Sequence, residues 1–488
     1  MVQAVRLRDD VDVATPSELR VSAVPGVASA EWQRAFGWIE GELGGRIVRA
    51  ERQARWRPAW FLDLERGGDT LPLYFRGERG EADHGAYALE HEMNVLQVLE
   101  RNGIPVPHVY GFCPEPRGIV MQRCPGRANL RTARDDAERV AVLDEYVSLL
   151  AKMHAIDPAD FERVGLERPS SPQTLGLGDF DVWERGYRRN KQRPEPLLEF
   201  VIGWVRRNVP HDRDRVSFLC ADAGQFLFDE GHVTAVLDLE LACLGDPAAD
   251  LAGMRCRDLS EPLGDLARAV RRYEQITGQA VDRSVIDYHT VRFAIVTPLA
   301  VAHLVARPPP GLDYVQYLSW YLVYGRAPID VIAREMQLEL SPVEVPGAEP
   351  TRHSAAHDWL RDALETHARE AATKAGAAAA DEGGDAGASD FVDYRFDATR
   401  RTAEYLRRAD RMGPALEAAD LDDVAELLGH RPESWQRADH ELEDLVLEAD
   451  PDLDAVLVSY FHRRMLRQEA LIDPIMRELR GATVQRID

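Results

Sequence analysis

The first quarter of the chain alternates short apolar runs with turn residues, a pattern that is typical of β-strands. Trp60–Leu64 and Leu71–Arg76 lie on either side of a Gly-Gly turn and predict a β-hairpin. Apolar positions with helical spacing follow over Ala86–Asn102, and Val109–Phe112 and Gly118–Gln122 predict two further strands. The pattern therefore predicts a small sheet-based lobe with one interposed helix.

Between about residues 130 and 340 the apolar positions recur with helical spacing. The predicted helices cover Ala137–Ile156, Leu197–Asn208, Pro262–Gly278 and Ile286–Ala306. One segment interrupts this pattern, because Phe226–Phe228 and Val233–Leu237 are short β-rich runs around a turn that contains Gly231. A β-hairpin inside a helical region is unusual, and it suggests that a functional site lies there.

The last part of the chain is rich in acidic residues and combines two kinds of sequence. The Ala/Gly/Asp-rich tract Thr373–Ser389 predicts a flexible linker. Beyond it, Tyr394–Arg411, Asp420–Leu428 and Asp452–Ile472 have the spacing of amphipathic helices, whose apolar stripes must be buried. We therefore expect a helical domain that folds on its own or forms a homo-oligomer, and that supplies no catalytic groups.

Charge and cysteine content narrow the class of protein. The 488 residues include 59 Lys and Arg against 83 Asp and Glu, a net charge of −24. Phosphate backbones and anionic lipids repel such a chain, so we expect neither nucleic acid nor a membrane as a partner. The most apolar stretch, Ala294–Ala306, is too short to span a bilayer. A charged N-terminal sequence and five cysteines without a CxxC pair favour a cytoplasmic protein.

Two carboxylates flank the predicted hairpin, Asp222 before it and Asp238 after it. Phosphoryl transfer needs such a pair, because one carboxylate orients the attacking hydroxyl and another holds Mg²⁺ on the phosphates. The alternative is that both are ordinary turn or cap residues. His154 at a helix end is interpreted as a packing or cap residue. The aromatic run Tyr314–Tyr321 is interpreted as core, with an apolar acceptor pocket as the alternative.

Short motifs also occur in a fixed order along the chain. They are Asn102–Pro107, Val120–Gly126, Leu150–Ala155, Leu219–Glu240 and Gly245–Ala252, the last reading GDPAADLA. In this order they resemble the aminoglycoside phosphotransferase and choline kinase-like family, whose motifs are GVPVP, VMERxPG, LAxLHA, HGDxxxxN followed by DWE, and GDPxxDLA. The resemblance covers about residues 35–335 and implies an α+β, bilobal protein-kinase-like fold with ATP between the lobes.

Together with composition, the resemblance divides the chain into five segments. They are an N-terminal extension (1–34), a strand-rich N-lobe (35–125), a helical C-lobe with the catalytic hairpin (126–345), a linker (346–389) and a C-terminal helical domain (390–488).

The resemblance implies catalytic and metal-binding roles for the hairpin region. Asp222 would be the base that orients the acceptor hydroxyl, and Asp238 would bind Mg²⁺. The family's His and Gly are Cys220 and Ala221 here, and a shorter loop puts Gln225 in place of a later Asn. Because Gln keeps an amide oxygen, Gln225 is expected as a second Mg²⁺ ligand; the alternative is that it only begins a strand.

The resemblance also implies how ATP would bind. Arg76 would reach the α- and β-phosphates with Glu92 paired to it, and the alternative is a solvent-exposed ion pair. Main-chain groups of Gln122 and Cys124 would contact adenine. The sequence has no GxGxxG phosphate-binding loop. The segment Arg52–Pro58, which contains three arginines, occupies the position of that loop and would either bind phosphates or form a solvated basic turn.

We therefore expect an ATP- and Mg²⁺-dependent kinase that phosphorylates a hydroxyl group of a small molecule. The alternative is a catalytically silent kinase-like protein that binds a nucleotide or metabolite, because the Cys220–Gln225 loop departs from the family pattern. Transfer of a nucleotidyl group is a third reading. The sequence leaves the acceptor open.

Overall fold

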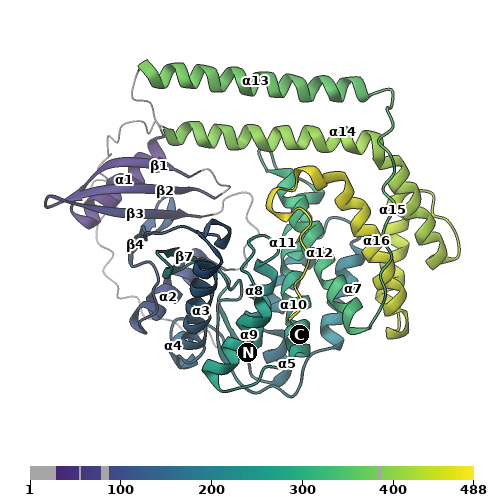
Figure 1. Ribbon diagram of the computed structural model, residues 1–488, viewed down its shortest axis with the longest axis horizontal. Coiled ribbons are helices and arrows are strands. Elements are labelled where there is room, and N and C mark those ends of the chain that lie inside the picture. The colour runs from purple at the N-terminus through teal and green to yellow at the C-terminus, as the bar shows by residue number, and fades with distance from the viewer. Residues whose placement is uncertain (1–28, 54–56, 79–86, 382–385, 488) are drawn as a thin grey trace, which may run out of the picture.

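The first lobe of the protein is a small antiparallel sheet (Figure 1). The computed structural model describes residues 29–53, 57–78, 87–381 and 386–487. The sheet has the order β1-β2-β3-β5-β4. Its elements are β1 (Arg46–Arg52), β2 (Ala59–Arg66), β3 (Asp69–Gly77), α2 (Leu89–Arg101), β4 (Val109–Pro114) and β5 (Arg117–Gln122). Arg66 pairs with Asp69 across the turn, which confirms the predicted hairpin.

Helix α1 (Ala30–Leu43) packs on this sheet and begins inside the stretch expected to be an extension. Phe36 and Ile39 of α1 are fully buried in one cluster with Leu62 and Phe75 of the sheet. The ring of Trp32 meets Phe75 edge-on, with centroids 5.6 Å apart. The N-lobe therefore includes residues before 35, because the apolar face of α1 covers the sheet.

The second lobe is mostly helical, as the spacing predicts. Its helices are α3 (Asp136–Met153), α4 (Pro158–Glu162), α5 (Pro172–Leu177), α6 (Phe180–Asn190), α7 (Pro196–Arg207), α8 (Ala248–Arg257), α9 (Leu266–Thr277), α10 (Arg283–Ala294), α11 (Val296–Ala306) and α12 (Tyr314–Glu335). Between α7 and α8, β6 (Ser217–Leu219) pairs with β9 (Cys243–Gly245). The predicted hairpin forms there as β7 (Phe226–Asp229) and β8 (His232–Val236).

The helix expected over Ile286–Ala306 is divided into α10 and α11 at Ile295. Pro298 lies in the first turn of α11, where its missing N–H is tolerated. The stretch Arg283–Ala306 is long and apolar enough to cross a membrane by length and composition. However, 78% of its most apolar window is buried inside the protein, as in the core helix of a globular lobe.

The last helices differ from the sequence expectation in their boundaries. They are α13 (Ser354–Asp381), α14 (Ala386–Leu428), α15 (Trp435–Glu448) and α16 (Asp454–Ile472). The tract Thr373–Ser389 is helical up to Asp381 and again from Ala386, because Ala favours helix strongly, so the prediction of a flexible linker is wrong. The two helices predicted over Tyr394–Arg411 and Asp420–Leu428 form a single helix, α14, which contains Pro414. Figure 1 shows α13 and α14 side by side.

These C-terminal helices share a core with the helical lobe. Leu457, Phe461 and Met465 of α16 are buried in the same cluster as Phe200 of α7 and Tyr317 of α12. The rings of Phe461 and Phe200 have centroids 5.5 Å apart. The apolar stripe of α16 is therefore buried against the helical lobe, and the C-terminal helices do not form a separate unit as we expected.

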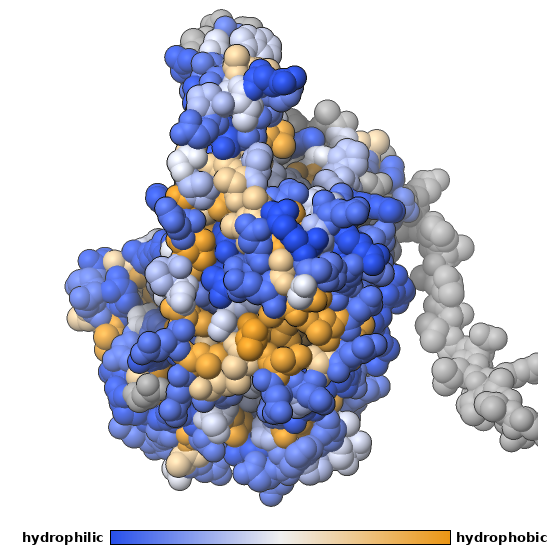
Figure 2. All heavy atoms as spheres, turned by 90° about the vertical axis from the view of Figure 1, so that its right-hand side faces the viewer, coloured by the Kyte–Doolittle hydropathy of each residue, from blue (hydrophilic) through white to orange (hydrophobic). Residues whose placement is uncertain are grey.

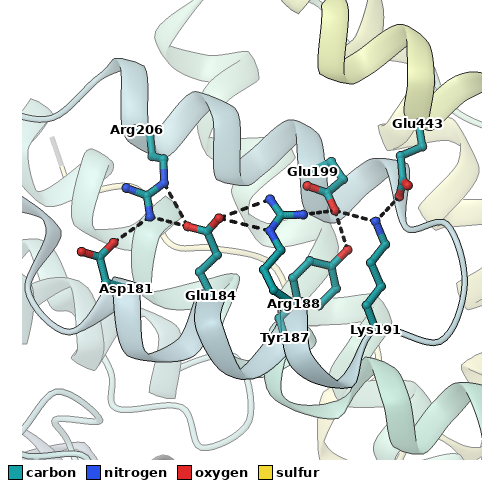
Figure 3. Close-up of polar contacts among 8 residues, drawn as sticks. All are labelled: Asp181, Glu184, Tyr187, Arg188, Lys191, Glu199, Arg206 and Glu443. Carbon is teal, nitrogen blue, oxygen red and sulfur yellow. Dashed lines mark hydrogen bonds and ion pairs between the residues drawn. The ribbon is translucent and has the colours of Figure 1, made fainter.

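Polar contacts also attach α15 to the helical lobe (Figure 3). Glu443 of α15 accepts hydrogen bonds from Lys191 Nζ and from the backbone N of Glu195, both at 2.6 Å. Lys191 also donates to Glu199 at 2.7 Å, and the same carboxylate oxygen accepts from the Tyr187 hydroxyl at 2.9 Å. This chain of contacts joins α6, α7 and α15.

A cavity of about 750 Å³ lies between α12, α14, α15 and α16. Its lining combines apolar groups such as Leu318, Leu421 and Trp435 with the guanidinium groups of Arg464 and Arg467. Apolar residues gather among polar ones on the face of the molecule that carries these helices, as Figure 2 shows.

Candidate active site

A cavity of about 400 Å³ lies between the sheet of the N-lobe and the hairpin of the helical lobe. The residues predicted to bind nucleotide and metal all line it, namely Arg76, Glu92, Gln122, Cys124, Gln225 and Asp238. Asp222, the predicted base, lies beside this cavity, because Gln225 Nε2 donates to its Oδ2 at 2.9 Å. The fold therefore brings together groups from β3, α2, β5 and both sides of the β7–β8 hairpin.

Strand β3 places the guanidinium of Arg76 against several carboxylates. Arg76 Nε donates to Glu92 Oε2 at 2.7 Å, and Nη2 donates to Glu240 Oε2 at 3.1 Å and to Asp238. The side chains of Arg76 and Glu92 are only 7% and 3% exposed, so the reading as a surface ion pair is wrong. Burial alone would lower the pKa of Arg76, but these three carboxylates hold it well above its ordinary value. The guanidinium stays charged.

The cluster around Arg76 contains more negative than positive charge. It comprises three carboxylates (Glu92, Asp238 and Glu240) and two guanidinium groups, since Arg57 also pairs with Glu240. Burial raises the pKa of Glu92, and Arg76 opposes that rise. Sequence reasoning gave no role to Glu240, although it follows Asp238 by two residues.

The tract Arg52–Pro58 does not offer its described arginines to a phosphate group. The Arg52 guanidinium packs over the rings of Trp32 and Trp60, 5.8 and 5.7 Å from their centroids. Arg57 forms the ion pair described above. Residues 54–56 of the tract, with the third arginine, lie outside the described residues. Arg52 and Arg57 therefore do not support the expectation that the arginines of this tract bind phosphates.

The end of β5, the residues that follow it and part of β2 border the cavity from the side of the N-lobe. The backbone N of Gln122 donates to the carbonyl of His108 at 2.8 Å, so a contact from Gln122 to adenine would use its carbonyl or side chain. Burial raises the pKa of the Cys124 thiol to about 11, so the thiol stays neutral. Phe61 and Met121 add apolar surface suited to a flat ring.

Hard oxygen donors for a cation come from two residues. Asp238 lies two residues after β8, with a φ of 57°, and Asp238 and Gln225 line the same cavity. Within the described ranges, no group of three or more His, Cys, Asp and Glu side chains is placed to hold a metal ion. Mg²⁺ commonly takes one or two protein carboxylates and completes its shell with phosphate oxygens and water. The donor set therefore fits Mg²⁺ bound together with a nucleotide.

Asp222 lies in the turn between β6 and β7, where two side chains hold its carboxylate. Arg257 Nε donates to Asp222 Oδ1 at 3.1 Å, and Arg257 Nη2 and Gln225 Nε2 both donate to Oδ2. Burial raises the pKa of Asp222, and the Arg257 guanidinium opposes part of that rise. These contacts fix the orientation of the carboxylate.

A buried carboxylate on α8 supports the backbone just before Asp222. Asp250 accepts from the backbone N of Cys220 at 2.9 Å and of Ala221 at 2.8 Å, and its Oδ2 lies 3.0 Å from His154 Nε2. Ala221 has φ 61, in the left-handed region that favours glycine. Its bond to Asp250 helps to stabilise that conformation. His154 is fully buried in this network, in agreement with its reading as a packing residue.

Sequence reasoning missed Arg257, although α8 contains a signal for it. Asp250, Gly253 and Arg257 are three and four residues apart and share one face of the helix. Asp250 binds the loop, a Cβ at Gly253 would lie 2.1 Å from the carbonyl oxygen of Ala221, and Arg257 binds Asp222. Arg257 could therefore have been found from the sequence, because it is the next residue on the same helix face after Asp250 and Gly253.

Comparison with known proteins gives a family match over the part of the chain that builds this cavity. A model of the phosphotransferase enzyme family matches residues 55–290. Acyl-CoA dehydrogenase family member 11 of Rattus norvegicus is 29% identical over 264 residues, which are 50% of this chain and 32% of that protein. Acyl-CoA dehydrogenase family member 10 of Mus musculus is 26% identical over 181 residues, 34% and 16% of the two chains. The chain thus spans about a third or less of the length of these relatives.

Solved structures of phosphotransferases are also similar to this chain. Macrolide 2'-phosphotransferase MphH from Brachybacterium faecium is 19% identical, with 56% of this chain and 92% of that chain covered and a TM-score of 0.41. A thermostable mutant of aminoglycoside phosphotransferase APH(4)-Ia, in complex with ADP and hygromycin B, is 14% identical, with 55% and 90% covered and a TM-score of 0.40.

Proposed function

From the premise that residues 55–290 belong to the phosphotransferase enzyme family, we propose that this chain is an ATP- and Mg²⁺-dependent kinase. Its acceptor is a hydroxyl group of a small molecule. ATP binds in the cavity between the lobes, with adenine against Gln122 and Cys124 and its phosphates toward Arg76.

One observation carries this proposal. A single cavity of about 400 Å³ is lined by a charged arginine, by the oxygen donors of Asp238 and Gln225 and by an apolar region beside β5. Asp222 is joined to that cavity through Gln225. Phosphoryl transfer needs a cation for the phosphates, oxygen ligands for a metal and a carboxylate for the acceptor, and these groups stand next to one another here.

In the proposed step, the hydroxyl oxygen of the acceptor attacks the γ-phosphorus of ATP. A new O–P bond forms, the bond to the β–γ bridging oxygen breaks, ADP leaves, and the hydroxyl proton passes to the Asp222 carboxylate. Arg257 and Gln225 keep that carboxylate oriented, and Arg76 provides positive charge for the phosphates. Mg²⁺, when held by Asp238 and Gln225, supplies compensation for phosphate charge.

The test is a screen for ADP release. The full chain is incubated with ATP, MgCl₂ and a panel of hydroxylated small molecules, and products are checked by mass for the gain of one phosphate. We expect at least one acceptor to raise ADP release above the rate with water alone and to gain that mass. Release of pyrophosphate with transfer of the nucleotide would indicate a nucleotidyltransferase instead and would contradict the proposed reaction.

A second candidate is a catalytically silent protein that binds a nucleotide or metabolite. The observation that favours it is the engagement of both Asp222 oxygens by Arg257, which competes with an acceptor hydroxyl. Calorimetric titration distinguishes the two readings. ATP binding without ADP release for any acceptor would support the silent protein, whereas ADP release that is lost with Asp222 supports the kinase.

A further inference from the structure

The segment Gly481–Ile487 runs along the helical lobe (Figure 1), and its Gln485 contacts Arg255 of α8 and Leu266 of α9. Arg326 Nη2 of α12 donates to the carbonyl of Ala482 at 2.7 Å, and Arg255 Nε of α8 donates to the carbonyl of Gln485 at 2.6 Å. Ile487 is 2% exposed and belongs to the hydrophobic cluster that surrounds the catalytic hairpin. The segment is therefore anchored at three positions, by two part-buried hydrogen bonds and by the buried side chain of Ile487.

The Gln485 side chain binds the connection between α8 and α9 at three points. Its Nε2 donates to Asp258 Oδ2 and to the carbonyl of Gly264, both at 2.7 Å. Its Oε1 accepts from the backbone N of Leu266 at 3.4 Å. Asp258 is itself 8% exposed, and its Oδ1 accepts from the backbone N of Leu263 at 2.7 Å. Gln485 thus closes a small network that gives the 258–266 connection its shape.

The same connection touches the candidate catalytic loop on its other side. Arg257, directly before it, binds Asp222. Leu263 packs against Gly224, where a Cβ would lie 2.9 Å from Leu263 Cδ1. Glu261 lines the cavity between the lobes. A shift of this connection would therefore be transmitted to the turn that carries Asp222 and Gln225.

We propose that Gln485 is a positioning residue for the active site: its side-chain amide holds the 258–266 connection, which in turn holds Arg257 and Leu263 against the Asp222–Gln225 turn. The inference rests on the proposed phosphotransfer, and it extends the active site beyond residues 55–290. Small displacements of a supporting group cost large factors in rate, because the reacting groups must be held within fractions of an ångström.

The test compares Gln485→Met, which keeps the side-chain length and removes the amide, with Thr483→Ala at an exposed position of the same segment. MgATP with water as acceptor is the probe, and ADP release gives kcat and KM. We expect Gln485→Met to lower kcat by about tenfold or more and to change KM for ATP by less than about twofold, because ATP contacts other residues. Thr483→Ala should match the wild type in both.

Two further measurements separate positioning from loss of fold. Hydrogen exchange should rise in the peptide that covers 258–266 in Gln485→Met, and not in Thr483→Ala. In an Arg257→Ala background, Gln485→Met should cause no further loss of kcat, because both changes act through one contact. Wild-type kcat in Gln485→Met, or a loss that is fully additive with Arg257→Ala, would overturn the inference. Absence of ADP release from the wild type, with water and with every hydroxylated acceptor of the panel, would instead refute the proposed phosphotransfer. Unchanged exchange in the 258–266 peptide would refute the role of Gln485 alone.

Discussion

Residues 53–261 and residues 291–487 differ in how the sequence encodes their roles. Every described residue that lines the cavity between the lobes falls between Gln53 and Glu261. The second region supplies helices that complete the core and line a different cavity, between α12 and α16. Chemistry requires particular groups at fixed spacings and therefore leaves motifs. Packing requires only apolar groups of suitable volume, so a region can be indispensable without a motif.

The largest effect should come from removing the helices of the second region that follow Glu349, α13 to α16. A chain that ends at Glu349 loses Leu457, Phe461 and Met465, which are buried against α7 and α12. At about 1.5–3 kcal/mol for each buried side chain, these three alone approach a net stability of about 5–15 kcal/mol. We expect the truncated chain to unfold or aggregate, as judged by circular dichroism and sizing. A folded, monodisperse fragment that releases ADP at the wild-type rate would show that the shared core is dispensable.

Within the first region, Asp250→Asn tests the support of the catalytic turn. The change replaces an oxygen that accepts from Cys220 or Ala221 with an amide donor and weakens the contact to His154. Breaking a buried charged network of this kind costs about 3–5 kcal/mol. Urea denaturation should show that loss, and ADP release should fall with it. Unchanged stability would mean that the Ala221 conformation is held by other contacts.

Asp246, in the same GDPAADLA motif as Asp250, tests the comparison through the pH dependence of the protein's stability. It is 1% exposed, and Arg213 donates to its two oxygens at 2.6 and 3.1 Å. Burial alone would raise its pKa, but His289, Arg213 and the backbone N of Ala248 hold the pKa well below its ordinary value. Its ionised form therefore stabilises the fold above the ordinary carboxyl pKa of about 4, and that contribution is lost as pH falls toward the native value.

Asp246→Asn should accordingly cost about 1–3 kcal/mol at pH 7, and the difference from the wild type should shrink below about pH 4. Thermal melts of both proteins from pH 3 to pH 8 provide the measurement. A difference in Tm that is constant across this range would contradict the assignment of the effect to the Asp246 charge.

The smallest effect is expected at the exposed end of the contacts in Figure 3. Arg206 pairs with Asp181 and Glu184 while its own side chain is 41% exposed. Exposed pairs of this type contribute about 0–1 kcal/mol and are screened by salt. Arg206→Ala should therefore change the urea midpoint only slightly, and less in 1 M NaCl. A loss above about 2 kcal/mol would place this network among the main supports of α6 and α7.

Local patterns predicted the elements of the first region well. The hairpins β2–β3 and β7–β8 follow from alternating apolar positions around Gly-containing turns, because both depend on neighbours in sequence. The motifs also placed Arg76, Glu92 and Asp238 in one cavity, since the resemblance fixed which elements meet.

The contacts that sequence reasoning missed are made over long separations. Arg257 meets Asp222 only because α8 folds back on the turn, and Gln485 meets Asp258 across 227 residues. The Thr373–Ser389 tract was misread for a different reason. Alanine favours helix while the accompanying Gly and Asp favour turns, and composition does not decide between them.

The role of Asp222 is the central claim, and Asp222→Asn tests it most directly. The change keeps the size of the side chain and removes its ability to accept a proton from an acceptor hydroxyl. Asp229→Asn on the β7–β8 hairpin, where the carboxylate is 52% exposed, is the matched control. For Asp222→Asn we predict a fall in ADP release of at least about 10²-fold, with the dissociation constant for MgATP nearly unchanged. For Asp229→Asn we predict wild-type values. Wild-type turnover in Asp222→Asn would contradict the account and remove Asp222 from the mechanism.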